Sequence, residues 1–354
     1  MEEKKDTLGM LDLVIRPGFC VKENQIIKVN QAAESLFITP GTDVRSLLLT
    51  GSEEYAAFTG GCLYLTLNLS SHSCGASVTR VDDIDVFLLE QESDNGELRS
   101  MALAARELRE PLTNVMITAD SLFPLCAAES SPRTAEQVAR LNRGLFQILR
   151  IIGNMSDAER CAAVSHQETV DIPALFAEFF EKAEALVSHT GITLTYEGPD
   201  QPIYGLADRE QLERAVLNIL SNAIKFTPKG GTVTAKLTRS GRMLRLSVTD
   251  SGSGIAQSVR SSVFSRYLRQ PALEDSRYGI GLGMVLIRTA AAHHGGAVLI
   301  DQPEGVGTRI TMTMSIRQSK QATLRSNVLR VDYAGERDHG LIELSECLPT
   351  ELYE

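Results

Sequence analysis

The sequence predicts a mixed α+β protein of several domains, and three observations lead to that prediction. Short apolar runs separated by Ser, Asp and Gly fill residues 10–90 and are typical of antiparallel strands. Apolar residues at heptad spacing over 105–155 predict a helical hairpin. Strands and amphipathic helices then alternate over 169–316, which predicts an α/β sandwich. A chain of 354 residues is long enough for two or three such domains.

The composition is that of a folded globular protein. Hydrophobic residues make up 43% and charged residues 23%, which excludes global disorder. No run approaches the roughly 18 apolar residues of a membrane span. The first ten residues lack the apolar core of a signal peptide, so we expect a cytoplasmic protein. A net charge of -10 argues against broad contact with nucleic acid, because such binding depends on neutralising phosphates. The six cysteines form no CxxC pair, so no zinc site is predicted.

Residues 1–92 are predicted to form a small α/β unit. The runs 62–69, 73–81 and 83–91 are rich in β-branched and large apolar residues and predict three antiparallel strands. Two shorter strands with a turn near 22–24, followed by a helix from Asn30, precede them. This order resembles a PAS sensory domain, in which the sheet cups a ligand or a partner. A dimerisation module with a filled core fits the same order.

Residues 93–166 are predicted to form a hairpin of two long helices. On the first, two sets recur every seven residues: Ala105, Leu112 and Ala119, and Leu108, Val115 and Leu122. On the second, apolar residues step by three and four from Val138 to Met155. Pro124 and Pro132 bracket the turn between them. Two helices cannot bury both seams alone, so we expect a homodimer in which a second copy completes a four-helix bundle.

Residues 167–317 are predicted to form the α/β sandwich. Helices are expected over 173–190, 208–227 and 283–296, and the strands are expected at 191–198, 231–239, 243–250, 297–302 and 307–316. The segment 318–354 is acidic and has little periodicity. We expect it to be a mobile or docking extension.

The first chemical motif is Asn218-x-x-x-Asn222, followed by Lys225 and Phe226. A four-residue spacing puts both carboxamides on one helix face, where an oxygen can complete a Mg²⁺ shell already filled by phosphates and waters. Lys225 lies one position further round and can meet phosphate charge. Two such Asn residues are also common as surface or capping residues.

The second motif, Asp250-Ser-Gly252-Ser-Gly254-Ile255, follows a predicted strand. A carboxylate at a strand end suits accepting a hydrogen bond from an adenine amino group, and the glycines let the ring approach the backbone. A simple turn is the alternative.

The third motif, Gly279-Ile-Gly281-Leu282-Gly283, opens a predicted helix, where backbone N–H groups can face phosphate. Its spacing does not fit a dinucleotide fingerprint, and no strand leads directly into it. The fourth motif, at 305–308, predicts a hairpin turn.

In this order and spacing, the four motifs resemble the N, G1, G2 and G3 boxes of the histidine-kinase branch of the GHKL ATPases. The run 263–270 resembles the F box of that family, and the resemblance covers about residues 95–316. It implies that the protein binds ATP and Mg²⁺, with Asn222 as the main metal ligand and Asn218 beside it. It also implies that Lys225 and Arg269 meet the phosphates and that Asp250 holds adenine. The other nucleotide-binding residues that it implies are Phe226, Gly252, Gly254, Ile255, Gly279, Gly281, Leu282, Gly283 and Thr308.

The sequence departs from this family at the phosphoacceptor. The family's H box reads like HELRTPL, whereas residues 106–112 read RELREPL, with Arg106 in place of the His. Pro111, at the place where the family tolerates a helix kink, fixes the alignment. A guanidinium stays protonated and only donates hydrogen bonds, so it offers no lone pair for phosphoryl transfer. Glu107 corresponds to the family's acid–base residue, and Glu110 stands where Thr or Asn is common, so phosphatase chemistry is not expected either.

Two roles remain open for Arg106: a surface ion pair with Glu110, worth roughly 0.2–0.5 kcal/mol, or a clamp on the γ-phosphate of ATP. Three functions also remain open. The first is an ATP-dependent switch or scaffold, a pseudokinase that docks a response regulator or pairs with a partner kinase. The second is a kinase acting on a partner in trans. The third is a slow ATPase, although Asn218 occupies the position where a general-base Glu would favour hydrolysis.

Overall fold

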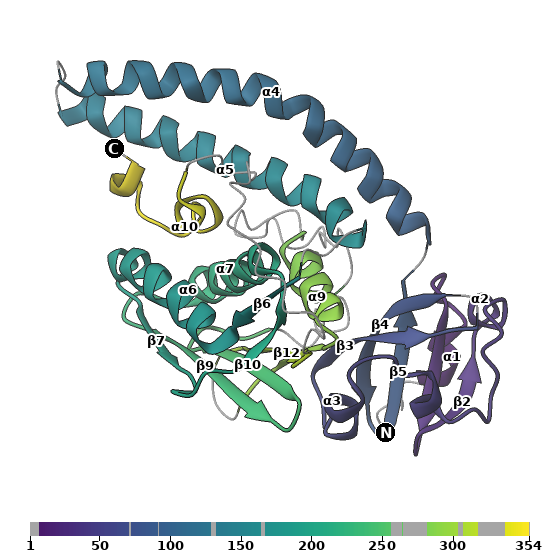
Figure 1. Ribbon diagram of the computed structural model, residues 1–354. Coiled ribbons are helices and arrows are strands. Elements are labelled where there is room, and N and C mark those ends of the chain that lie inside the picture. Colours follow the sequence, from purple (N-terminus) through teal and green to yellow (C-terminus); the bar gives the residue numbers. More distant parts are fainter. Residues whose placement is uncertain are drawn as a thin grey trace, which may run out of the picture.

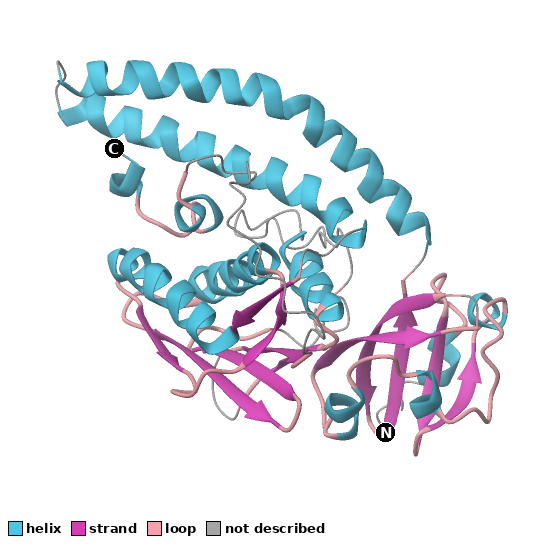
Figure 2. Ribbon diagram, viewed as in Figure 1, coloured by secondary structure: helices cyan, strands magenta, loops and turns pink. Residues whose placement is uncertain are grey.

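The computed structural model describes residues 7–70, 72–90, 92–128, 132–163, 167–255, 264, 282–303, 307–317 and 337–353. Figure 1 and Figure 2 show an α/β unit at the N-terminal end, a hairpin of two long helices, and an α/β sandwich beneath that hairpin. This mixed α/β architecture confirms the predicted fold class at that level. Among the helices that the structure describes, none combines the length and the apolarity needed to cross a bilayer.

The N-terminal unit is a five-stranded antiparallel sheet flanked by short helices. Its strands are β1 (Gly18–Lys22), β2 (Gln25–Val29), β3 (Cys62–Asn68), β4 (Ser73–Val81) and β5 (Ile84–Leu89), in the order β2-β1-β5-β4-β3. The helices are α1 (Thr7–Leu11), α2 (Gln31–Glu34), η1 (Val44–Leu47) and α3 (Ser52–Ala56). Positive φ angles at Glu23 and Asn24 suit the β1–β2 hairpin turn, which confirms the turn predicted there. Phe19 stacks on Phe87 in the core, with 4.7 Å between ring centroids.

The hairpin consists of α4 (Glu92–Ala128) and α5 (Pro132–Ala163). The predicted seam of Ala105, Leu112 and Ala119 is buried, and these small and apolar side chains allow the two helices to approach closely. The second predicted seam is exposed, with 50% of Leu108 and 51% of Val115 accessible to solvent. In Figure 1, α5 lies between α4 and the sandwich.

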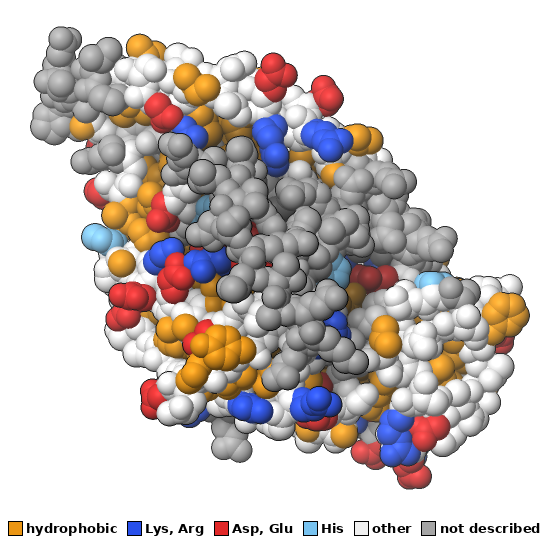
Figure 3. Space-filling view, in the orientation of Figure 1, with side chains coloured by type: hydrophobic (Ala, Val, Ile, Leu, Met, Phe, Trp, Pro, Cys, Tyr) orange, Lys and Arg blue, Asp and Glu red, His pale blue; other side chains and the backbone are white. Residues whose placement is uncertain are grey.

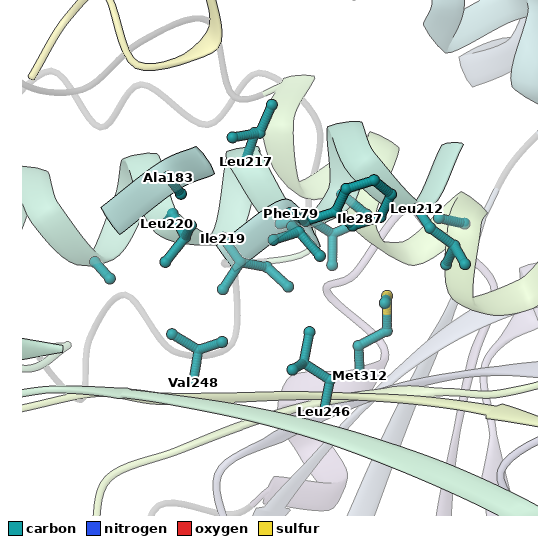
Figure 4. Close-up of a cluster of buried hydrophobic side chains, with 14 of the residues drawn as sticks. Phe179, Ala183, Leu212, Leu217, Ile219, Leu220, Leu246, Val248, Ile287 and Met312 are labelled. Carbon is teal, nitrogen blue, oxygen red and sulfur yellow. The ribbon is translucent and has the colours of Figure 1, made fainter. Parts of the chain in front are cut away.

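The sandwich packs three helices on one face of a sheet. The helices are α6 (Ile172–Val187), α7 (Arg209–Phe226) and α9 (Leu282–His293), with a short turn η2 (Ser188–Thr190) after α6. The strands are β7 (Thr193–Glu197), β9 (Thr232–Ser240), β10 (Met243–Asp250), β11 (Val298–Asp301) and β12 (Arg309–Ser315), in the order β11-β12-β10-β9-β7. Figure 4 shows apolar side chains of the helices, such as Phe179 and Ile287, meeting Leu246, Val248 and Met312 of the sheet.

One small ribbon of the sandwich was not predicted from the sequence. β6 (Glu168–Asp171) pairs with β8 (Tyr204–Ala207) as a separate two-stranded sheet. Each strand has only four residues, too few for an alternating pattern to stand out from a loop.

The N-terminal unit and the sandwich share one continuous sheet. β3 pairs antiparallel with β11, with Tyr64 opposite Val298 and Cys62 opposite Ile300, so that ten strands form a single sheet. The junction is reinforced by Arg288 of α9, whose guanidinium lies 2.5 Å from a Glu90 carboxylate oxygen and 5.0 Å from the centre of the Tyr64 ring. This pairing was not predicted, because the residues of an edge strand do not indicate which strand it will pair with.

The C-terminal segment, defined here as Arg337–Tyr353, packs between the hairpin and the sandwich. It contains α10 (His339–Glu343) and a short turn η3 (Thr350–Tyr353), which lie next to α5 in Figure 1. Its buried apolar side chains are Ile342, Leu344, Leu348 and Tyr353. Of the two predicted states for this extension, docking is therefore the one that the described residues adopt.

Candidate nucleotide-binding site

The predicted N-box residues lie on α7. This helix is capped by Asp208, whose side chain accepts a hydrogen bond from the backbone N–H of Gln211. Leu212, Ile219 and Leu220 anchor its apolar face in the core of the sandwich (Figure 4). The helical period places Asn218, Asn222 and Lys225 on another face.

The two carboxamides lie beside the start of α9. Asn222 Nδ2 is 3.9 Å from the Met284 sulfur. A methyl group built on Gly283 would come within 2.8 Å of Asn218 Oδ1, so the absence of a side chain there lets α9 approach α7. The structure thus brings the predicted N-box and G2-box residues together.

Asn218 has a buried acceptor that fits a metal ion. Its side chain is buried, and its Nδ2 donates to Arg214 O at 2.9 Å and to a Glu343 carboxylate oxygen at 3.3 Å. Among the residues that the structure describes, Oδ1 has no hydrogen-bond partner. A buried acceptor without a partner is costly, and a carboxamide oxygen is a ligand type that Mg²⁺ accepts.

Asp250 connects the predicted G1 and G3 motifs. Its buried carboxylate oxygen Oδ1 accepts hydrogen bonds from Gly252 N at 2.8 Å and Thr308 N at 3.2 Å. Burial raises the pKa of Asp250, while these two backbone bonds pull the pKa the other way. Both bonds reach one oxygen, which leaves Oδ2 as an acceptor for a ligand.

Two glycines around Asp250 are required by close backbone contacts. Gly307 has a φ of 108°, and a methyl group built on it would lie 1.8 Å from Asp250 O. A methyl group built on Gly252 would lie 2.4 Å from Phe226 O, at the end of α7. Residues 250–252, the end of α7 and residues 307–308 therefore form one tightly packed loop cluster. Gly254 and Ile255 continue it, with Gly254 at a φ of 73°.

Arg269, Gly279 and Gly281 lie outside the described residues. Leu282, the first residue of α9, is buried with Val285 against Met101 of α4 and Met155 of α5. The G2 end of α9 therefore contacts both helices of the hairpin.

The H-box position lies away from α7. Arg106 and Glu107 are exposed on α4, and among the described residues Arg106 forms no ion pair with Glu110. The hairpin helix that faces α7 is α5, whose Arg150 Nη2 donates to Ser221 Oγ at 3.1 Å and whose Asn154 Oδ1 accepts from Arg214 at 2.6 Å.

Two residues at this site were missed by sequence reasoning, Glu343 and Glu346 of the C-terminal segment. Glu346 lies 2.8 Å from Lys225 Nζ, and Glu343 is fully buried beside Asn218 and Arg214. Burial works to raise the pKa of Glu346, but Arg150 and Lys225 outweigh it and hold that pKa below its ordinary value. The acidic composition of the tail was the one signal for these residues.

Part of this chain matches a known protein family. Residues 207–318 match the family described as "Histidine kinase-, DNA gyrase B-, and HSP90-like ATPase". The chain is 29% identical over 276 residues to an uncharacterised sensor-like histidine kinase of Rhizobium meliloti, covering 73% of this chain and 52% of that protein. It is 28% identical over 264 residues to the adaptive-response sensory kinase SasA of Synechocystis, covering 70% of this chain and 68% of SasA.

The fold is also similar to a solved structure. The crystal structure of full-length ShkA in complex with AMPPNP aligns with a TM-score of 0.51 and 23% identity, over 64% of this chain and 47% of that one. Residues 207–318 therefore form a GHKL ATPase domain. Over 73% of its length the chain is similar to a sensor-like histidine kinase, and it spans about half the length of that Rhizobium protein.

Proposed function

We propose that this protein is a histidine kinase-like member of a two-component system that binds Mg-ATP and uses it as a switch, without phosphorylating Arg106. The observation that carries the proposal is the joining of four separated segments at one site. Gly307 and Thr308 contact Asp250, Gly252 packs against the end of α7, and Gly283 at the start of α9 packs against Asn218, which supports one site built from all four.

Each side chain has a role in this proposal. Asp250 Oδ2 accepts from the adenine amino group, and Asn222 with Asn218 holds Mg²⁺. Lys225 and Arg269 meet the phosphates, while the remaining predicted pocket residues shape its walls. Bound Mg²⁺ supplies neutralisation of phosphate charge.

Arg106 separates this protein from an autophosphorylating kinase. Its guanidinium has no lone pair for the γ-phosphoryl group. ATP then acts as a ligand whose presence sets how the ATPase domain sits on the helical hairpin, either with Arg106 as a γ-phosphate clamp or with Arg106 in solvent.

The exposed apolar surface of the hairpin supports a second copy of the chain as a partner. Exposed apolar residues recur every seventh position on each helix of the hairpin and are called the apolar stripe here: Leu108, Val115 and Leu122 on α4, and Leu141 and Ile148 on α5. Figure 3 shows apolar side chains at the surface where α4 lies. A second copy of the chain would cover this stripe and complete a four-helix bundle. We further propose a PAS-like sensory role for the N-terminal unit, a cytoplasmic location, and a response regulator or partner kinase as the downstream partner.

The proposal is tested by following the labelled γ-phosphate of ATP. The full chain, with and without a candidate partner, is incubated with Mg²⁺ and γ-labelled ATP. If the protein is a switch, the label should stay on ATP. Label on the added partner would instead establish a kinase acting in trans, and steady release of labelled phosphate would establish an ATPase.

A further inference from the structure

The C-terminal segment places a carboxylate on the lysine that the proposed function assigns to phosphate. Glu346 Oε2 lies 2.8 Å from Lys225 Nζ and 3.1 Å from Arg150 Nη1. The Lys225 side chain is only 12% exposed, so its ammonium pairs with this carboxylate in a largely buried setting. A carboxylate and a phosphate oxygen are both anionic, so they repel each other when both contact one ammonium.

A second carboxylate lies further along the same face of α7. Glu343 is fully buried, with one oxygen 3.2 Å from Arg214 Nε. Its other oxygen is 3.3 Å from Asn218 Nδ2 and 3.4 Å from Arg150 Nε. The segment thus holds both ends of the row Asn218–Asn222–Lys225 through acidic side chains.

The segment is docked by a built interface rather than by these two charges alone. Arg143 of α5 donates to Ser345 O at 2.9 Å and to Glu346 O at 3.1 Å. Asn142 donates to Tyr353 O at 2.9 Å, and the Tyr353 ring packs edge-on against Phe146 at 5.2 Å. These contacts fix the position of Glu346 relative to Lys225.

We propose that the C-terminal segment Arg337–Tyr353 is an acidic plug that competes with the phosphates of ATP for Lys225 and the adjoining face of α7. This inference rests on the proposed function, because it assumes that α7 binds the phosphates. Glu346 is the displaceable end, since its side chain is 29% exposed whereas that of Glu343 is fully buried. Competition is reciprocal, so the segment lowers ATP affinity and ATP loosens the segment by the same factor.

The test compares the full chain with two variants, Glu346→Gln and the control Glu351→Gln. Glu346→Gln keeps the shape of the side chain but removes its charge, so Mg-ATP should bind about fivefold more tightly or better, at the lower end of typical couplings between sites. Glu351 is exposed in the same segment, and its substitution should leave the affinity unchanged. Isothermal titration calorimetry measures the Mg-ATP affinity of all three proteins.

Hydrogen exchange of residues 338–353 supplies a second readout. These amides should be protected in the nucleotide-free protein and should exchange faster when Mg-ATP is added. Equal ATP affinity for the wild type and Glu346→Gln, with protection unchanged by ATP, would overturn the plug and leave the nucleotide site standing. Protected amides together with no ATP binding by any of the three proteins would overturn the proposed function, and the plug with it.

Discussion

At the scale of single residues, the hydrogen bonds and the burial of Asp250 define its chemistry. Two backbone N–H groups fix its Oδ1, and burial raises its pKa above the ordinary 3.8. A raised pKa means that keeping the ionised form in the folded protein costs free energy at neutral pH. A donor arriving at Oδ2 offsets part of that cost, which suits the carboxylate to bind an adenine amino group.

Asp250→Asn should lower Mg-ATP affinity about 10- to 100-fold, because a hydrogen bond to a charged group contributes about 1.5–3 kcal/mol. The exposed Asp12→Asn, in the N-terminal unit, should bind as the wild type does. Wild-type affinity should also decline as the pH falls through the raised pKa of Asp250, when the carboxylate protonates. Calorimetry over a pH series checks both effects, and an Asp250→Asn affinity equal to wild type would remove Asp250 from the site.

The site residues that could be predicted from the sequence are those that belong to local motifs. Asn218 and Asn222 share a helix turn, and Asp250 and Gly252 share a loop, so spacing alone brings them together. Glu343 and Glu346 could not be predicted, because they are 129 and 121 residues away in sequence from Arg214 and Lys225, which they contact. Such contacts form only when the tail packs on the rest of the protein, and the tail has no hydrophobic periodicity that would predict this packing.

At the scale of elements, the helical hairpin leaves one apolar face uncovered. Val115→Glu should weaken dimer formation, since a charge in a bundle seam loses hydration without gaining a partner. Ile117→Glu is the matched control, because Ile117 is 57% exposed on the same helix but points away from the stripe. Analytical ultracentrifugation measures the two dissociation constants. Dimers of equal strength, or a wild-type monomer, would contradict the four-helix bundle.

The junction between the N-terminal unit and α9 makes a second prediction at this scale. Arg288 has a side chain only 4% exposed, pairs with Glu90 and donates to Phe264 O at 2.9 Å. Arg288→Ala should lower the free energy of unfolding by about 1–3 kcal/mol, because buried polar groups lose their partner. Lys236→Ala, which breaks an exposed pair with Glu197, should change it by less than about 1 kcal/mol. Urea unfolding compares them, and equal effects would mean that the junction contributes nothing.

The elements themselves were largely predictable, and their partners were not. Strands β3, β4 and β5 and helix α7 follow from period and turn residues that lie within each segment. The pairing of β3 with β11 does not, because Leu63 and Leu299 are ordinary apolar strand residues. The four-residue strands β6 and β8 were too short to carry a pattern.

At the scale of the whole molecule, the elements of the candidate nucleotide site contact each of the other described units. The start of α9 contacts both hairpin helices, its middle carries the Arg288–Glu90 pair to the N-terminal unit, and the C-terminal segment bridges α5 and α7. A ligand that moves α9 or displaces Glu346 would therefore alter contacts with every part. These contacts support the proposal that ATP binding acts as a switch.

The measurement that tests this account most directly is a base-quenched labelling experiment run beside an equilibrium binding isotherm. The full chain is titrated with Mg-ATP, and a parallel sample with γ-labelled ATP is quenched in base to preserve phosphoramidates. The account predicts saturable binding of one nucleotide per chain with no label on the protein. Label on the chain, or no binding at all, would contradict it.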